Sequence, residues 1–166
     1  MNPAGRTLRQ GIVVGLIAYA SVAVFYAAFD LLASRGTLYT VNLLGLAVFH
    51  RLDDASVLQM PIAPDLGAIS SYNALHLVLS VVIGLVVTSL VDLAEHIPSR
   101  RPAIVAVIIA GYFVTVGAVG MLSTPIRPVL PWWSIIVANG SAVVFSWAYL
   151  TRVRPGMWQR IMPGSK

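Results

Sequence analysis

The amino-acid sequence predicts an all-α polytopic membrane protein: a bundle of four transmembrane helices with a short interfacial or re-entrant helix in the first outer loop. Three observations lead to this prediction. The 166 residues are 58% hydrophobic and only 10% charged, with a mean hydropathy of +0.84, whereas soluble domains carry about 25% charged residues. Four apolar runs are long enough to cross a bilayer, and all ten prolines lie outside them. We expect residues 1–166 to form one transmembrane domain.

The four predicted spans cover residues 11–32, 72–94, 103–122 and 132–150, with 19 to 23 residues each. About 20 residues are needed to cross the hydrocarbon core. Unbroken apolar stretches such as 81–87 are typical of a helix in lipid and differ from the alternating pattern of a barrel strand. Pro102 and Pro131 stand at predicted helix starts, where the missing N–H of proline is tolerated.

The segments outside the spans are predicted to lie at the membrane surface. Residues 37–49 are apolar but too short to span, which favours an interfacial or re-entrant helix; a hydrophobic loop is the alternative. Residues 55–70 are expected to form a loop that ends in a Ser70–Ser71 cap before the second span. Residues 151–166 mix hydrophobic and basic side chains, which predicts an amphipathic tail on the headgroups.

The basic residues predict the orientation. Eight Lys and Arg residues fall in the N-terminal tail, residues 95–102 and the C-terminal tail, against three in the other two loops. The positive-inside rule therefore predicts cytoplasmic termini, and the short loops suggest a bacterial inner membrane. An alternative is that the first apolar run is a cleavable signal peptide with small residues at 18–23, although the run is long for such a segment.

Catalytic and cofactor motifs are absent from the sequence. Without cysteine the chain cannot form disulfides, thiolate nucleophiles or iron–sulfur ligands. It also lacks the zinc-protease, hydrolase and nucleotide-binding motifs HExxH, GxSxG and Walker A. We therefore expect a protein that is not an enzyme and has no metal, no cofactor and no nucleic-acid partner. A haem between His50 and His76 would require residues 37–49 to fold back over the bundle, and ordinary polar histidines are the favoured interpretation.

A stripe of polar and small residues runs along the second predicted span at every fourth position. Its members are Tyr72, His76, Ser80, Gly84, Thr88 and Asp92. Residues four apart are neighbours on a helix surface, so the stripe could line a proton path or a polar cavity. It could equally be a packing seam that admits a neighbouring backbone. Gly84 cannot relay a proton, which favours the seam. The small-residue pairs Gly11/Gly15, Ala106/Ala110 and Gly111/Thr115 suggest further close packing.

Four polar residues within the spans need partners or water. Asp30 and Asp92 lie near span ends, which favours solvated carboxylates at the interface. His76 is expected near the outer leaflet, with Asp30 as its acidic partner; a hydroxyl or a backbone carbonyl is the alternative partner. Asn139, near the middle of the fourth span, is expected to face the bundle or a partner subunit.

Together these features favour a non-catalytic accessory or scaffold subunit of a larger membrane complex, for example an energy-transducing one. Its expected partners are the lipid bilayer and other membrane-protein subunits. The second hypothesis is a small channel or transporter in which the stripe of the second span lines a pathway. A weaker third hypothesis is a redox membrane protein that binds haem or quinone.

Overall fold

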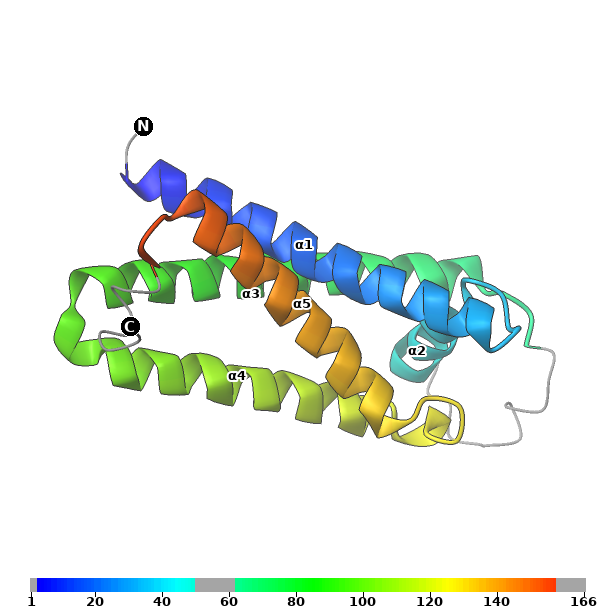
Figure 1. Cartoon of the computed structure of the whole chain (residues 1–166). Coiled ribbons are helices and arrows are strands. Elements are labelled where there is room, and N and C mark those ends of the chain that lie inside the picture. Colours follow the sequence, from blue (N-terminus) through cyan, green and yellow to red (C-terminus); the bar gives the residue numbers. More distant parts are fainter. Residues whose placement is uncertain (1–2, 50–61, 158–166) are drawn as a thin grey trace.

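The computed structural model describes residues 3–49 and 62–157, and every regular element within them is a helix. Four helices are long and apolar enough to cross a membrane: α1 (Pro3–Leu32), α3 (Leu66–His96), α4 (Arg101–Leu122) and α5 (Trp132–Val153). A shorter apolar helix, α2 (Tyr39–Phe49), follows α1, and the short turns η2 (Pro98–Arg100) and η3 (Thr124–Ile126) flank α4. The predicted fold class is confirmed, and the chain has the build of a multi-pass membrane protein (Figure 1).

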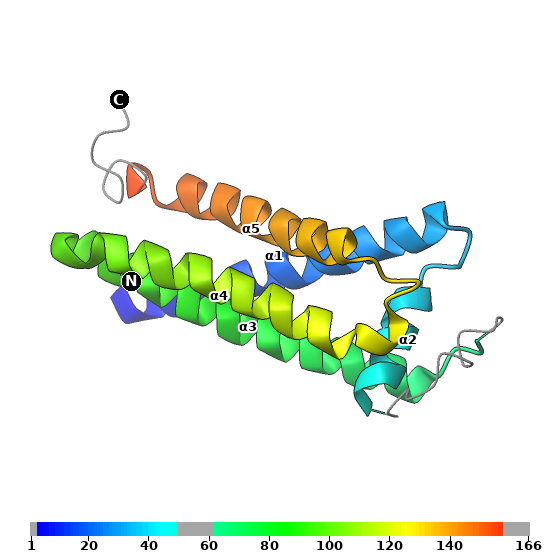
Figure 2. The same cartoon turned by 90° about the horizontal axis from the view of Figure 1, so that it is seen from below.

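The helices α1, α3 and α5 form the packed part of the bundle. Helix α1 runs along α3 and is crossed by α5, whereas α4 has far fewer contacts with α3 and α5 (Figures 1 and 2). The start of α1, the α3–α4 turn and the end of α5 lie at one end of the bundle. We call it the arginine-rich end, after Arg6, Arg9, Arg100, Arg101, Arg152 and Arg154. The opposite end, which carries α2, is called the α2 end.

Helix α2 lies crosswise to the bundle axis at the α2 end (Figures 1 and 2). The helix predicted over 37–49 is confirmed, and its crosswise direction suits an interfacial helix better than a re-entrant one. Asp30 of α1 accepts hydrogen bonds from the Thr40 backbone N–H at 2.7 Å and the Thr40 hydroxyl at 2.6 Å. This carboxylate therefore satisfies an N–H in the first turn of α2 that would otherwise lack a partner.

Helix α3 begins at Leu66, so the predicted loop up to Ser70–Ser71 is wrong over its last residues. Asp65 is the N-cap, and its carboxylate accepts a hydrogen bond from the Ala68 N–H at 3.0 Å. The cap is held by α2, because the Asn42 side chain accepts from the Asp65 N–H at 2.9 Å. Residues 62–65 are described and lie outside any helix, as the loop prediction requires, whereas 55–61 lie outside the described residues.

The C-terminal segment also differs from the prediction. Helix α5 continues to Val153, and the Arg154 N–H still bonds the Leu150 carbonyl at 2.9 Å. Arg154 and Met157 are buried, so this part of the predicted tail is attached to the bundle at two positions, while Arg152, Val153, Pro155 and Gly156 are exposed. Residues 158–166 of the predicted tail lie outside the described residues.

The core has two clusters of buried hydrophobic residues, one near each end of the bundle. At the arginine-rich end Val14, Val91, Ile104 and Leu150 bring α1, α3, α4 and α5 together. At the α2 end Leu43 and Leu44 of α2 join residues of α4, η3 and α5. These clusters attach α4 to the other helices.

Candidate functional site

A buried polar cluster at the arginine-rich end joins three helices. The Arg154 guanidinium donates from Nε to Gln10 Oε1 at 2.8 Å, and from Nη1 to Asp92 Oδ1 at 3.2 Å and Glu95 Oε2 at 2.9 Å. Only 4% of the Arg154 surface is exposed. We call these four residues, from α1, α3 and the end of α5, the Arg154 cluster.

The helix ends explain how the cluster forms. Asp92 and Glu95 are three residues apart on the last turns of α3, so they share one face of that helix. Arg154 is the C-cap residue of α5, with non-helical backbone angles, and its side chain reaches both carboxylates. Gln10 lies two turns into α1, which begins at Pro3. The cluster thus depends on helical turns that extend beyond the apolar runs.

The electrostatics of the Arg154 cluster indicate a structural role. One arginine faces two carboxylates, and Arg6 lies 4.0 Å from Asp92 at the rim. Arginine does not release its proton in proteins, so the cluster holds a fixed positive charge at its centre. Arg154 Nη2 is buried with no hydrogen-bond partner among the described residues. A charge that stays fixed, with one nitrogen lacking a hydrogen bond, is more consistent with a structural link between helices than with a proton relay.

Of the four residues in this cluster, only Asp92 was a candidate from the sequence, and it was expected to be solvated. Its side chain is 28% exposed and bonds Arg154. Gln10, Glu95 and Arg154 fall outside the predicted spans and were missed. A signal did exist, because an acidic pair at three-residue spacing and a basic segment were predicted at the same membrane face.

The middle of the polar stripe of α3, from Ser80 to Thr88, faces the inside of the packed bundle, whereas His76 is partly exposed. Gly84 lies against the backbone of Gly11 and Gly15, with no room for a side chain on any of the three. Ser80 and Thr88 are buried, and the Thr88 hydroxyl has no hydrogen-bond partner among the described residues. Tyr72 is packed beside the cluster at the α2 end, and Asp92 joins the Arg154 cluster. Over its middle the stripe is therefore closed by the close contact between α1 and α3.

The expected pair between Asp30 and His76 is not formed. Asp30 is fully buried, not solvated, and each of its carboxylate oxygens accepts a hydrogen bond from Thr40. The His76 ring instead lies beside the rings of Tyr19 and Tyr72, with centroid distances of 5.2 and 6.0 Å. The early start of α3 explains the error, since His76 is ten residues into that helix and not near its end.

The remaining candidates do not assemble into a second site. The Asn139 amide donates to the Ile135 carbonyl of its own helix at 2.9 Å. Within residues 3–49 and 62–157 no three His, Asp or Glu side chains come together as metal ligands would. His50, the other residue of the haem hypothesis, lies outside the described residues.

Comparison of the chain with protein-family models, curated proteins and solved structures found no match to any of them. The function must therefore follow from the chemistry of this chain's own residues.

Proposed function

We propose that the protein is a non-catalytic scaffold or accessory subunit that binds another transmembrane segment through α4. The observation that supports this most is an outward-facing stripe of small residues on the least attached helix. Ala103, Ala106, Ala110 and Gly117 lie within about 60° of one another around α4. Among the described residues, no neighbour outside the adjoining turns of α4 comes within 4 Å of a β-carbon placed on Gly117. Phe113, 65% exposed, projects from the same face.

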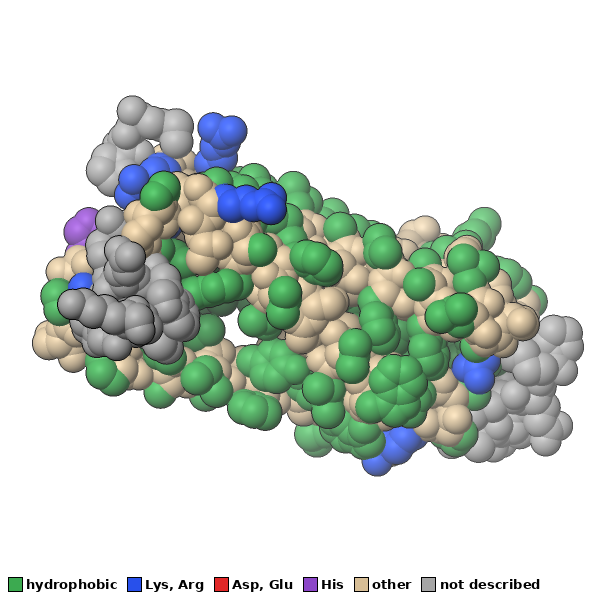
Figure 3. All heavy atoms as spheres, viewed as in Figure 1, with side chains coloured by type: hydrophobic (Ala, Val, Ile, Leu, Met, Phe, Trp, Pro, Cys, Tyr) green, Lys and Arg blue, Asp and Glu red, His purple; other side chains and the backbone are tan. Residues whose placement is uncertain are grey.

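The packing of α4 also favours a partner. Only Ile104, Val116 and Gly120 of this helix are buried, and Figure 3 shows an opening through the molecule between α4 and α5. Transmembrane helices associate through close packing, for which small residues provide the space. Helix α4 offers this kind of surface without a neighbour among the described parts of the chain.

The channel hypothesis has less support. A pathway along the α3 stripe would pass Gly84, where the backbones of α1 and α3 are in contact. The described part of the chain therefore has no continuous polar route through the α1–α3 contact.

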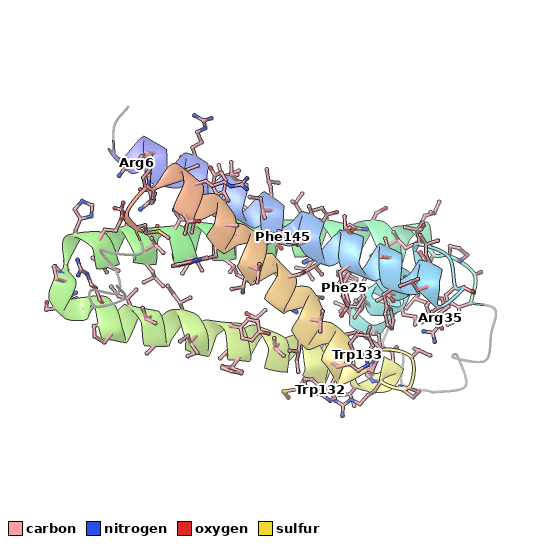
Figure 4. All side chains as sticks on the ribbon, in the orientation of Figure 1. Arg6, Phe25, Arg35, Trp132, Trp133 and Phe145 are labelled. Atoms are coloured by element: carbon pink, nitrogen blue, oxygen red, sulfur yellow. The ribbon has the colours of Figure 1, made fainter. Side chains whose placement is uncertain are left out.

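We also propose that the arginine-rich end faces the cytoplasm, as in the plasma membrane of a bacterium. That end carries six arginines against Asp92 and Glu95, and Figures 3 and 4 show basic side chains gathered there, with Arg6 among them. At the α2 end, Arg35 and Arg127 donate hydrogen bonds to the carbonyls of Val129 and Gly120, and Trp132 and Trp133 are clustered nearby (Figure 4). Such asymmetry follows the positive-inside rule.

Cysteine labelling tests this orientation. Because the natural chain has no cysteine, the variants Ser34→Cys and Ser99→Cys each provide one exposed thiol, at opposite ends of the bundle. An impermeant maleimide added to intact cells is expected to label the Ser34→Cys variant alone, and both variants after lysis. Labelling of the Ser99→Cys variant in intact cells would contradict the orientation.

Substitution of the α4 stripe tests the scaffold function. We expect Gly117→Leu to lower recovery of the native complex in mild detergent by about tenfold, because a large side chain separates the helices. The matched control is Gly111→Leu: Gly111 is also on α4 and also open to 4 Å, but it lies about 120° around the helix from Gly117. A cysteine introduced in place of Ala106 should crosslink to the same partner. Migration of the wild-type chain as a free monomer would argue against this function.

A further inference from the structure

A polar cluster lies between α1 and α3, away from the Arg154 cluster and from α4. The Tyr19 hydroxyl donates to Asn73 Oδ1 at 3.1 Å, and the His76 ring lies beside Tyr19 with a centroid distance of 5.2 Å. Asn73 donates in turn to the Ile69 carbonyl at 3.0 Å. We call Tyr19, Asn73 and His76 the mid-depth patch.

The depth of this patch follows from the polar residues above and below it. On α1, Gln10 and Asp30 are 20 residues apart, or about 30 Å along a helix, which is the thickness of the hydrocarbon core. Tyr19 lies next to their midpoint. On α3, His76 lies about 4 Å from the midpoint between Asp65 and Asp92. Both helices therefore place the patch near the centre of the bilayer.

The His76 ring lacks hydrogen-bond partners among the described residues: neither ring nitrogen has one, and the side chain is partly exposed. Charging an imidazole at the membrane centre is costly, and its neutral form carries one donor and one acceptor. Lipid tails can satisfy neither, and the polar headgroups lie about 15 Å away.

We infer that the mid-depth patch is the contact site for a second copy of this chain. Two copies related by a two-fold axis along the membrane normal present the same residues at the same depth. A neutral imidazole carries one donor and one acceptor, so the His76 ring of one copy can donate to the His76 ring of the other. The Tyr19 hydroxyl gives its own proton to Asn73, and its oxygen can accept from a remaining ring N–H. Leu16 and Leu79 are exposed one turn away on α1 and α3 and provide an apolar rim. This inference uses a different surface from the α4 stripe and does not rest on the proposed function.

Disulfide crosslinking in native membranes tests the self-association. In the naturally cysteine-free chain, Leu16→Cys or Leu79→Cys is expected to give a dimer on mild oxidation. Val144→Cys is the control, because Val144 is exposed near mid-depth on α5 and this variant should stay monomeric. Adding His76→Leu to the Leu79→Cys chain should lower the dimer yield about three- to tenfold, the effect of one or two hydrogen bonds within a membrane.

Further measurements separate this inference from its rivals. Circular dichroism and the unfolding midpoint of the His76→Leu chain should match the wild type, which excludes misfolding as the cause of a lower yield. If His76→Leu misfolds, the comparison of the Leu79→Cys and Val144→Cys chains still decides. A crosslink to a different protein, or equal dimer yields from those two chains, would overturn the inference. The inference would also be overturned if the wild-type chain is a monomer that co-purifies with a lipid-soluble compound and the His76→Leu chain does not bind this compound. That result would indicate a small-molecule site.

Discussion

Replacing Arg154 with leucine is expected to destabilise the folded protein by about 3–5 kcal/mol, the usual cost of breaking a buried ion pair by removing one partner. The reason lies in what is left behind. Without the guanidinium, Asp92 and Glu95 lose the cation that separates them, and Gln10 loses its donor. The loss can be measured as a change in the unfolding free energy in detergent, obtained by titrating the protein with increasing mole fractions of a denaturing surfactant.

The neighbouring residue Arg152 provides the control. It is exposed, has the same charge and lies two residues earlier on α5. Because exposed ion pairs and isolated surface charges contribute little, Arg152→Leu should change the unfolding free energy by no more than about 0.5 kcal/mol. Equal losses for both variants would mean that charge at this end matters and the Arg154 cluster does not.

Two further variants test whether the geometry of the cluster or only its charge is needed. Arg154→Lys keeps the charge but loses the planar fork that serves Gln10 and Asp92 together, so an intermediate loss is expected. In the triple variant Arg154→Leu, Asp92→Asn and Glu95→Gln, no buried charge is left unpaired. Most of the stability should return, as it does when a buried ion pair is replaced as a unit.

The spans could be predicted from the sequence because hydrocarbon imposes one simple requirement, a run of about 20 apolar residues. The start of α3 and the path of the chain at the end of α5 could not be predicted, since both depend on distant partners. Helix α3 starts at Leu66 because Asp65 caps it and Asn42 of α2 holds that cap. Beyond the end of α5, Arg154 stays in the bundle because it finds Gln10, Asp92 and Glu95.

The candidate site was only partly predictable for the same reason. The fourfold spacing of the α3 stripe places Ser80, Gly84 and Thr88 on one side of the helix, because such spacing is a local property of one helix, and all three are buried. Which partner each residue meets depends on the rotation of neighbouring helices, and this is not written in local spacing. Asp30 was therefore assigned to His76, although the start of α2 brings Thr40 to it instead.

Replacing Gly84 with leucine is expected to be the most damaging single change between α1 and α3. A β-carbon at this position would lie 2.8 Å from the Gly15 Cα and also against the Gly11 carbonyl oxygen. These are backbone atoms, so the strain can be relieved only by moving the helices apart. Overpacking a tight core costs about 1–3 kcal/mol and at times more, and Gly84→Ala should show a smaller part of the same loss. The unfolding free energy in detergent is again the measurement.

The control for bulk is Gly111→Leu on α4, where a β-carbon meets nothing within 4 Å, and its unfolding free energy should stay close to that of the wild type. Thr88→Val separates packing from transport. The Thr88 hydroxyl is buried without a partner among the described residues, so its replacement by a methyl group should be neutral or slightly stabilising. If α3 instead lined a proton or ion path, Thr88→Val would abolish flux in proteoliposomes while Gly84→Leu left folding intact. That pattern is the opposite of what close packing between α1 and α3 predicts, namely a large loss of stability for Gly84→Leu and almost none for Thr88→Val.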